Sequence, residues 1–163
     1  MEAQLKDVLR VLEADARTTP EQIAVMTGRP LDEVAAIIKQ AESDGILLGY
    51  RAQVNWDKAG ESQVWALIEV KVTPQRDFGF DAIAERIYRF PETHSMYLVS
   101  GQYDLAVMVA GHTMQEVSGF VSAKIATIEG VQGTVTHFLM KRYKEGGIIV
   151  EGEPTVQRQP YSL

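Results

Sequence analysis

Residues 19–45 read TPEQIAVMTGRPLDEVAAIIKQAESDG, and this stretch decides the fold of the first part of the chain. Its opening threonine and proline, together with Gln22, form a capping-box start for a helix. Gly28 suits a left-handed stop, so this helix is short. A second, longer helix begins after Pro30 and ends at Gly45. A short helix, a tight glycine turn and a longer helix are the helix-turn-helix pattern.

A further helix precedes this pattern, and an extended segment follows it. The apolar residues of the first helix recur at helical spacing, at Leu5, Val8, Leu9 and Leu12. The apolar side of the longest helix holds Leu31, Val34, Ile38 and Ala41. Residues 46–56 then read ILLGYRAQVNW, which favours extended backbone. We predict three helices with a trailing strand or small wing, while a generic three-helix bundle fits the same periodicity.

The rest of the chain alternates strand and helix patterns. Alternating apolar residues predict half-buried strands, and stripes at helical spacing predict helices. Two of the strands are separated only by a short polar turn, which predicts a hairpin. The predicted elements are, in order, a strand over 65–72, a helix over 80–88, strands over 96–99 and 104–110, a helix opened by a second capping box at Thr113, and a strand over 134–143.

This β-α-β-β-α-β order is the split βαβ arrangement of a ferredoxin-like sandwich. With the N-terminal helices it makes the fold class α+β. Residues 145–163 carry three glycines and two prolines with little periodicity. We expect this tail to be loose or to lie over a neighbouring subunit.

Composition limits the function classes. The net charge is −6, from 16 Lys and Arg against 22 Asp and Glu, so generic polyanion binding is disfavoured and any contact with DNA must rest on local geometry. The absence of cysteine excludes disulfides, thiolate metal sites and a cysteine nucleophile. No run of about 18 apolar residues occurs, and residues 1–10 are charged, so we expect a cytoplasmic protein with no membrane partner.

Three short motifs in this order carry a resemblance to a known family. They are the G-x-x-x-G-Y entry at Gly45, Gly49 and Tyr50, the GxYD turn at Gly101, Tyr103 and Asp104, and the run at Gly130, Val131, Thr134 and Thr136. Over residues 2–144 the chain resembles the Lrp/AsnC (leucine-responsive, or feast-famine) transcriptional regulators. The resemblance implies that the N-terminal domain binds double-stranded DNA. It implies that the C-terminal domain forms dimers and larger oligomers and binds a small effector, usually an amino acid.

The resemblance and the patterns together suggest four segments. Residues 1–48 form a helix-turn-helix, winged-helix-like DNA-binding domain, and residues 49–63 form a linker strand. Residues 64–144 form the ferredoxin-like effector-binding and oligomerisation domain, and residues 145–163 form the C-terminal tail.

The expected recognition helix departs from the family pattern. Where the family usually carries arginines or lysines, this chain has Ala36, Ile37 and Gln40. Between residues 31 and 44 a single cation, Lys39, faces four acids. Base reading needs paired donors and acceptors, which Gln40 offers, and phosphates need cations or free helix N-termini. The candidate DNA contacts are therefore Arg29, Lys39, Gln40 and Arg51. The alternative is a sensing or partner-binding module that has lost sequence-specific DNA binding.

The hairpin turn is the candidate effector site. Asp104 can accept a hydrogen bond from a ligand ammonium group, and Gly101 lets the backbone approach a ligand closely. By resemblance, the effector cleft between subunits includes Ser100, Gly101, Gln102, Tyr103, Asp104, Thr134 and Thr136. The competing interpretation is structural: the glycine makes a tight hairpin, and the aspartate bonds the turn backbone.

We expect neither an enzyme nor a cofactor, because no GxSxG, P-loop or dinucleotide motif occurs. His94, His112 and His137 fall on different elements, so no metal site is expected. Some relatives with this two-domain plan are tetrapyrrole decarboxylases, whose C-terminal cleft holds histidine and arginine. Here the segment after Tyr50 reads RAQVNW, without histidine. The basic run at residues 141–144 is predicted to be solvated.

Overall fold

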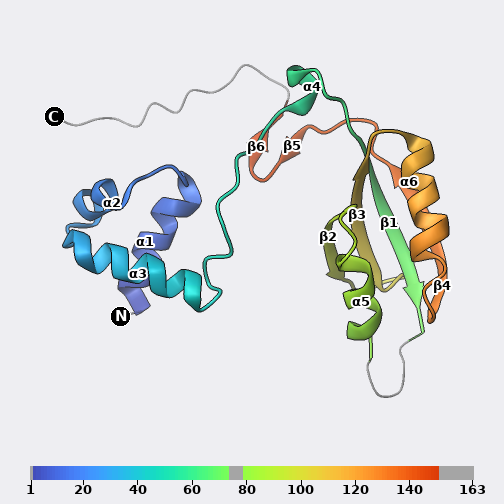
Figure 1. The fold of residues 1–163 in the computed structure, drawn as a ribbon, viewed down its shortest axis with the longest axis horizontal. Coiled ribbons are helices and arrows are strands. Elements are labelled where there is room, and N and C mark those ends of the chain that lie inside the picture. Colours follow the sequence, from blue (N-terminus) through green and yellow to red (C-terminus); the bar gives the residue numbers. More distant parts are fainter. Residues whose placement is uncertain (1, 74–78, 151–163) are drawn as a thin grey trace. The chain divides into compact units, whose positions relative to one another are not determined.

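The chain divides into two compact units, Met1–Val54 and Asn55–Leu163. The computed structural model describes residues 2–73 and 79–150, and each unit is considered by itself (Figure 1). No helix within these described ranges is long and apolar enough to cross a membrane.

The N-terminal unit is built from three helices. They are α1 (Glu2–Ala14), α2 (Pro20–Thr27) and α3 (Leu31–Ser43). Each helix contributes apolar side chains to one small core, formed by Val8, Leu12, Ile23, Ala24 and Val34. This arrangement confirms the predicted N-terminal helices.

Local signals fix the ends of α2 as predicted. The Gln22 N–H donates to the Thr19 hydroxyl at 3.4 Å, and the Thr19 N–H donates to the Gln22 side chain at 2.9 Å. Gly28 ends the helix with a φ of +66°, a left-handed conformation that glycine adopts without strain. The buried side of α2 is Ile23 with Ala24, whereas Met26, which the periodicity placed on the apolar side, is 57% exposed.

The predicted linker strand over residues 49–63 is wrong, and so is the predicted wing. No strand occurs in the described part of the N-terminal unit, and residues 49–55 have no regular secondary structure. The linker instead holds a single helical turn, α4 (Trp56–Ala59), because the Asn55 side chain caps it by accepting from the Lys58 N–H at 3.1 Å. Extended residues make a strand only beside a partner strand, and no described strand of this chain lies beside residues 49–55.

The second unit confirms the predicted ferredoxin-like sandwich. An antiparallel sheet in the order β2-β3-β1-β4 packs against helices (Figure 1). Its strands are β1 (Val64–Val72), β2 (Thr93–Leu98), β3 (Leu105–Gly111) and β4 (Val131–Phe138). Its helices are α5 (Asp81–Tyr88), α6 (Met114–Phe120) and the π-helical turn η1 (Val121–Ile125).

The two faces of the sheet differ. One face carries alternate residues of β1 and β3, which pack against α5, α6 and η1 in a buried core that includes Ile68, Val70, Val107, Ile83 and Ile125. Because the side chains of a strand alternate between faces, the intervening residues lie on the other face. Helices α5 and α6 and the turn η1 lie on the opposite side from this open face, which holds Leu67, Glu69, Lys71, Ala106, Met108, Val135 and His137. At one end of the face Arg142 lies over the buried Trp65.

Three predictions for this unit need correction: the end of the last strand, the geometry of the helix after Thr113 and the start of the tail. The last strand ends at Phe138 rather than Tyr143, because β1 begins at Val64 and leaves no partner beyond that point. The helix after Thr113 changes to π geometry at Val121. The tail is not loose from its start, since β5 (Lys144–Glu145) and β6 (Ile148–Ile149) pair as a hairpin around two glycines with positive φ. The remaining tail, 151–163, lies outside the described residues.

Candidate functional site

The outer face of α3 is short of cations. Val34 and Ala41 point into the N-terminal unit, and Ala36, Lys39 and Gln40 are exposed. The Gln40 side-chain amide donates to the Asp44 carboxylate at 2.8 Å, which orients it along the helix. This face therefore presents one lysine and one glutamine among small and acidic side chains.

Arg29 lies inside the N-terminal unit rather than on a free surface. Its guanidinium contacts Glu33 of α3 at 3.1 Å and Asp7 of α1 at 3.6 Å, and its side chain is only 19% exposed. Its Nε atom is buried and has no hydrogen-bond partner in the described structure. These contacts make Arg29 a link between α1 and α3, placed directly before α3.

Arg51 follows α3 on the segment that leads into the linker. Its side chain is exposed, and the neighbouring Tyr50 hydroxyl donates to the Glu42 carboxylate at 3.0 Å. Burial, together with this hydrogen bond to a negative group, raises the pKa of Tyr50. The hydrogen bond attaches the start of the linker to the last turn of α3, so Arg51 is held close to that helix.

The turn between β2 and β3 brings five of the candidate effector residues together. Ser100, Gly101 and Gln102 are exposed, and Tyr103 and Asp104 are half-buried. Gly101 has a φ of +154°, which side-chain-bearing residues rarely adopt, and among the described residues beyond its chain neighbours no atom lies within 4 Å of where its Cβ would be. The turn is therefore open on the side of Gly101.

Asp104 is bound to β1 by its carboxylate. It accepts a hydrogen bond from the Val72 N–H at 2.9 Å and contacts the Lys71 ammonium at 3.2 Å. The Val72 hydrogen bond, followed by Lys71, lowers the pKa of Asp104 despite the opposing effect of desolvation. Asp104 therefore accepts a backbone hydrogen bond, but the bonded backbone belongs to β1 and not, as the structural interpretation predicted, to the turn.

Thr134 and Thr136 do not share a face of the sheet with Asp104. In the β1–β4 register Thr134 lies opposite Val70 and Thr136 opposite Ile68, and these two β1 residues face the helices. Directly opposed residues share a face, so both threonines point toward the helical side, whereas Asp104 joins Lys71 on the open side. Within one chain, the threonines and the turn do not form a single cleft.

The histidines occupy separate places. His94 packs edge-on against Trp65 with a ring separation of 4.7 Å. His137 contacts Glu69 at 3.2 Å on the open face of the sheet. No group of three or more metal-binding side chains occurs in the described parts of the chain.

Sequence reasoning missed Lys71 and misread Arg142. Arg142 was expected to be solvated, yet its side chain is only 14% exposed: it contacts Asp57 at 3.3 Å and Glu145 at 3.1 Å and lies over the Trp65 ring. These contacts fasten α4 and β5 to the sheet. The Lys71–Asp104 and Arg142–Asp57 pairs have no signal in the sequence, because only the fold brings their residues together.

Comparison with known proteins identifies the family. The Lrp/AsnC ligand binding domain matches residues 65–149, which is more than half of the chain. An uncharacterized HTH-type transcriptional regulator of Bacillus subtilis (strain 168), YugG, is 45% identical over 146 residues, covering 89% of this chain and 88% of that protein. The chain belongs to the Lrp/AsnC family. Its predicted place in this family is therefore confirmed.

Two solved structures share the fold. The leucine response regulatory protein LrpA of Mycobacterium tuberculosis aligns with a TM-score of 0.75 at 21% identity, covering 91% of this chain and 98% of that one. A transcriptional regulator of Neisseria meningitidis, solved as a complex with L-Met, aligns with a TM-score of 0.69 at 22% identity, covering 87% and 91% of the two chains.

Family membership settles the broad function. An Lrp/AsnC protein of this kind is a DNA-binding transcriptional regulator with a ligand-binding domain. It is not an enzyme, so the alternative hypothesis of a tetrapyrrole decarboxylase is wrong.

Proposed function

We propose that this Lrp/AsnC regulator binds spaced DNA half-sites as a dimer or larger oligomer, and that an amino acid bound to its C-terminal domain changes this binding. The observation that carries the proposal is a three-helix unit with an exposed α3 face, joined in one chain to an Lrp/AsnC ligand binding domain. We also propose a cytoplasmic location, where such a regulator meets chromosomal DNA.

The proposed DNA contacts are Lys39, Gln40 and Arg51. Lys39 and Arg51 are exposed cations that can neutralise phosphates, and Gln40 carries a side-chain amide suited to adenine. Arg29 contributes by holding α3 against α1 rather than by phosphate contact, because Asp7 and Glu33 occupy its guanidinium. A face with one lysine binds each half-site weakly, so paired helices in an oligomer supply the affinity.

The proposed effector site is centred on the turn Ser100–Asp104. Asp104 and Lys71 form an ion pair at 3.2 Å beside it. We propose that a zwitterionic amino acid exchanges for this pair, with its ammonium group on Asp104 and its carboxylate on Lys71. A Neisseria meningitidis relative of the same fold was solved with L-Met, which supports an amino acid as the ligand class. Thr134 and Thr136 remain candidates through a second subunit, since within this chain they face the helices.

The proposed surface for self-association is the open face of the sheet. Leu67, Ala106 and Met108 lie at its centre, and the exposed Val135 lies on its edge strand. A sheet face whose apolar centre is not covered by the helices of its own chain is stabilised when a second copy excludes water from it. Two such faces joined by a twofold axis would place two α3 helices in one dimer.

The test is fluorescence-anisotropy titration of the full chain against a fragment of its own upstream DNA. Titrations are run at two salt concentrations, with and without a mixture of the twenty amino acids and with L-Met alone. We expect sequence-preferring, salt-dependent affinity that the mixture changes. Lys39→Gln should reduce the slope of log affinity against log salt by about 1 for each half-site bound, and Lys58→Gln, which removes an exposed cation of α4, should leave it unchanged. Binding no tighter than to random DNA would instead favour a sensing module that acts through protein partners.

A second measurement tests the effector site. Asp104→Ala should abolish the amino-acid response while DNA affinity without amino acids is retained. Asp104→Asn keeps an acceptor for the Val72 N–H but removes the charge, so it separates ligand recognition from the structural hydrogen bond. Loss of the folded sheet in both variants would show that Asp104 acts only structurally.

A further inference from the structure

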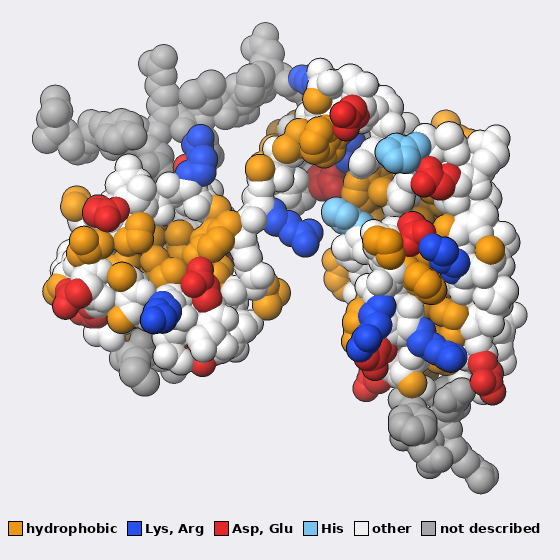
Figure 2. Space-filling model, viewed as in Figure 1, with side chains coloured by type: hydrophobic (Ala, Val, Ile, Leu, Met, Phe, Trp, Pro, Cys, Tyr) orange, Lys and Arg blue, Asp and Glu red, His pale blue; other side chains and the backbone are white. Residues whose placement is uncertain are grey.

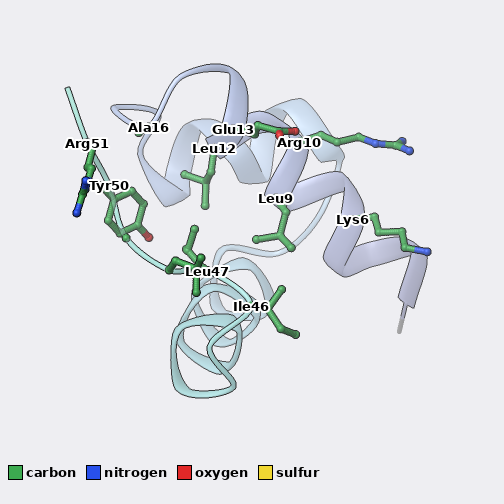
Figure 3. Close-up of a pocket in the computed structure, with 12 residues that line it drawn as sticks. Lys6, Leu9, Arg10, Leu12, Glu13, Ala16, Ile46, Leu47, Tyr50 and Arg51 are labelled. Atoms are coloured by element: carbon green, nitrogen blue, oxygen red, sulfur yellow. The ribbon is translucent and has the colours of Figure 1, made fainter. Parts of the chain in front are cut away.

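A groove runs along one side of the N-terminal unit. One wall is a face of α1, and the other is the segment 46–51, which leads away from α3. Figure 3 shows Leu9 and Leu12 of α1 directed toward Leu47, with the charged side chains at the margins. The groove encloses about 550 Å³, within the range of small-molecule sites.

The floor of the groove is apolar and stays in contact with water. Leu12 is almost buried, and Leu9 and Leu47 are half-buried. Ile46 is 51% exposed and Leu48 is 92% exposed. Figure 2 shows that hydrophobic side chains reach the surface of this unit among charged ones. Burying this apolar surface under a ligand is favourable, by roughly 25 cal/mol for each Å² removed from water.

The rim of the groove is basic, although the chain is acidic. Lys6, Arg10 and Arg51 line it, against one acid, Glu13. Arg10 and Arg51 form no ion pair with any described residue, unlike Arg17, which contacts Asp15 at 3.3 Å outside the groove. In Figure 3 Arg10 and Arg51 lie at opposite ends. An anionic group at either end would therefore meet an arginine that forms no ion pair within the described part of the chain.

We propose that this groove binds an amphipathic carboxylate, a small molecule with an aliphatic body and one anionic head. The aliphatic body covers the leucines, and the carboxylate pairs with Arg10 or Arg51. A phosphate backbone would leave the apolar floor uncovered, and a cationic ligand would be repelled by the rim. The site is separate from the ligand binding domain at residues 65–149, so it is a second small-molecule site, in the DNA-binding unit.

Occupancy has a structural consequence for the linker. The lining includes Gly49, Tyr50 and Arg51, which carry the chain from α3 toward α4. A ligand that contacts both α1 and these residues restrains the segment by which α3 is attached. A ligand in this groove therefore acts on the DNA-binding unit directly.

The experiment is a methyl NMR titration of the isotope-labelled full chain with sodium octanoate. Octylammonium chloride is the matched probe, with the same chain length and the opposite charge. We expect octanoate to shift the methyl signals of Leu9, Leu12 and Leu48 with a dissociation constant at or below about 1 mM, corresponding to about −4 kcal/mol. Octylammonium should bind at least about fivefold more weakly, since like charges repel.

Charge-removing variants assign the head group. Arg10→Gln with Arg51→Gln should weaken octanoate binding about threefold to tenfold and remove its salt dependence. Arg17→Gln, at an exposed arginine outside the groove, should leave the affinity unchanged. The two single variants show which end of the groove holds the carboxylate.

Several results would overturn the proposal. One is the absence of shifts at octanoate concentrations of about 5 mM. Another is equal binding of both probes, or shifts confined to other parts of the chain. A third is a change of oligomeric state. If the double variant differs from the natural chain in molar mass by light scattering, and octanoate produces no effect on either protein, then a second copy of the chain covers the groove.

Discussion

Gly130 is the position where adding a single methyl group should be most informative. It precedes β4 with a φ of +94°, and a Cβ built on it would lie 2.6 Å from Cδ1 of Ile83. Ile83 is 1% exposed and packs in the core of the second unit from α5. Gly130→Ala therefore meets two separate costs, a strained backbone and an overpacked core.

The two costs can be estimated and then separated. Left-handed backbone costs alanine about 1–2 kcal/mol, and overpacking costs about 1–3 kcal/mol, so the free energy of unfolding should fall by about 2–5 kcal/mol. Ile83→Val removes the clashing Cδ1 and alone costs about 0.5–1.5 kcal/mol. In that background Gly130→Ala should cost only the backbone share, about 1–2 kcal/mol, which gives a coupling energy of about 1–3 kcal/mol.

The assay is urea unfolding followed by tryptophan fluorescence. Both tryptophans, Trp56 and Trp65, lie in the Asn55–Leu163 unit, so the signal reports on the unit that holds Gly130. All variants are compared at one protein concentration, because oligomerisation shifts apparent stability. Gly133→Ala is the matched control, because no described atom beyond its chain neighbours lies within 4 Å of its Cβ, and it should change stability by less than about 0.5 kcal/mol. An equal cost of Gly130→Ala with isoleucine and with valine at position 83 would refute the steric argument.

Three further predictions concern single side chains. Arg29→Gln breaks the link between α1 and α3 and should lower the free energy of unfolding of the N-terminal helices, seen by circular dichroism, by about 1–2 kcal/mol, without changing the salt slope of DNA binding. Thr19→Ala removes the α2 cap and should cost about 0.5–2 kcal/mol in the same assay, with Thr19→Ser restoring most of it. Because folding lowers the pKa of Asp104, its stabilising effect is complete above the ordinary value of 3.8 and is lost as the pH falls through the lower folded value. Asp104→Asn should therefore flatten the acid side of the stability curve measured by urea unfolding, and an unchanged acid side would contradict this reasoning.

Local signals in the sequence were sufficient for most of the fold. The capping box at Thr19 and the glycine stop at Gly28 each involve residues within one turn, so they act alike in any chain that contains them. The alternation along β1 and the short turn after β2 similarly reflect one buried face and one hairpin. Such local signals were enough to predict the β-α-β-β-α-β order of the sandwich.

Pairings between distant residues could not be predicted. The linker has the composition of a strand but no described strand beside it, so residues 49–55 stay without regular structure. Arg29 is a cation directly before α3 and was therefore predicted to contact phosphate, yet the fold places Asp7 and Glu33 against it. The contact between Asp104 and Lys71 depends on the β1–β3 register, which brings the two side chains together. Each outcome is decided by tertiary contacts, which residue spacing along one chain does not specify.

The acidic surroundings of α3 bear on how the proposed regulation would operate. A helix that offers Lys39 among four acids gains little from phosphates, so each half-site contributes a small free energy. Linked weak sites act through their effective concentration, which falls sharply when the geometry no longer allows both to engage. If two α3 helices are held by one oligomer, a small ligand-induced change in their spacing would release the DNA, whereas a strongly basic helix would remain bound through one half-site. On the proposed function, weak recognition at each half-site makes the effector response steeper.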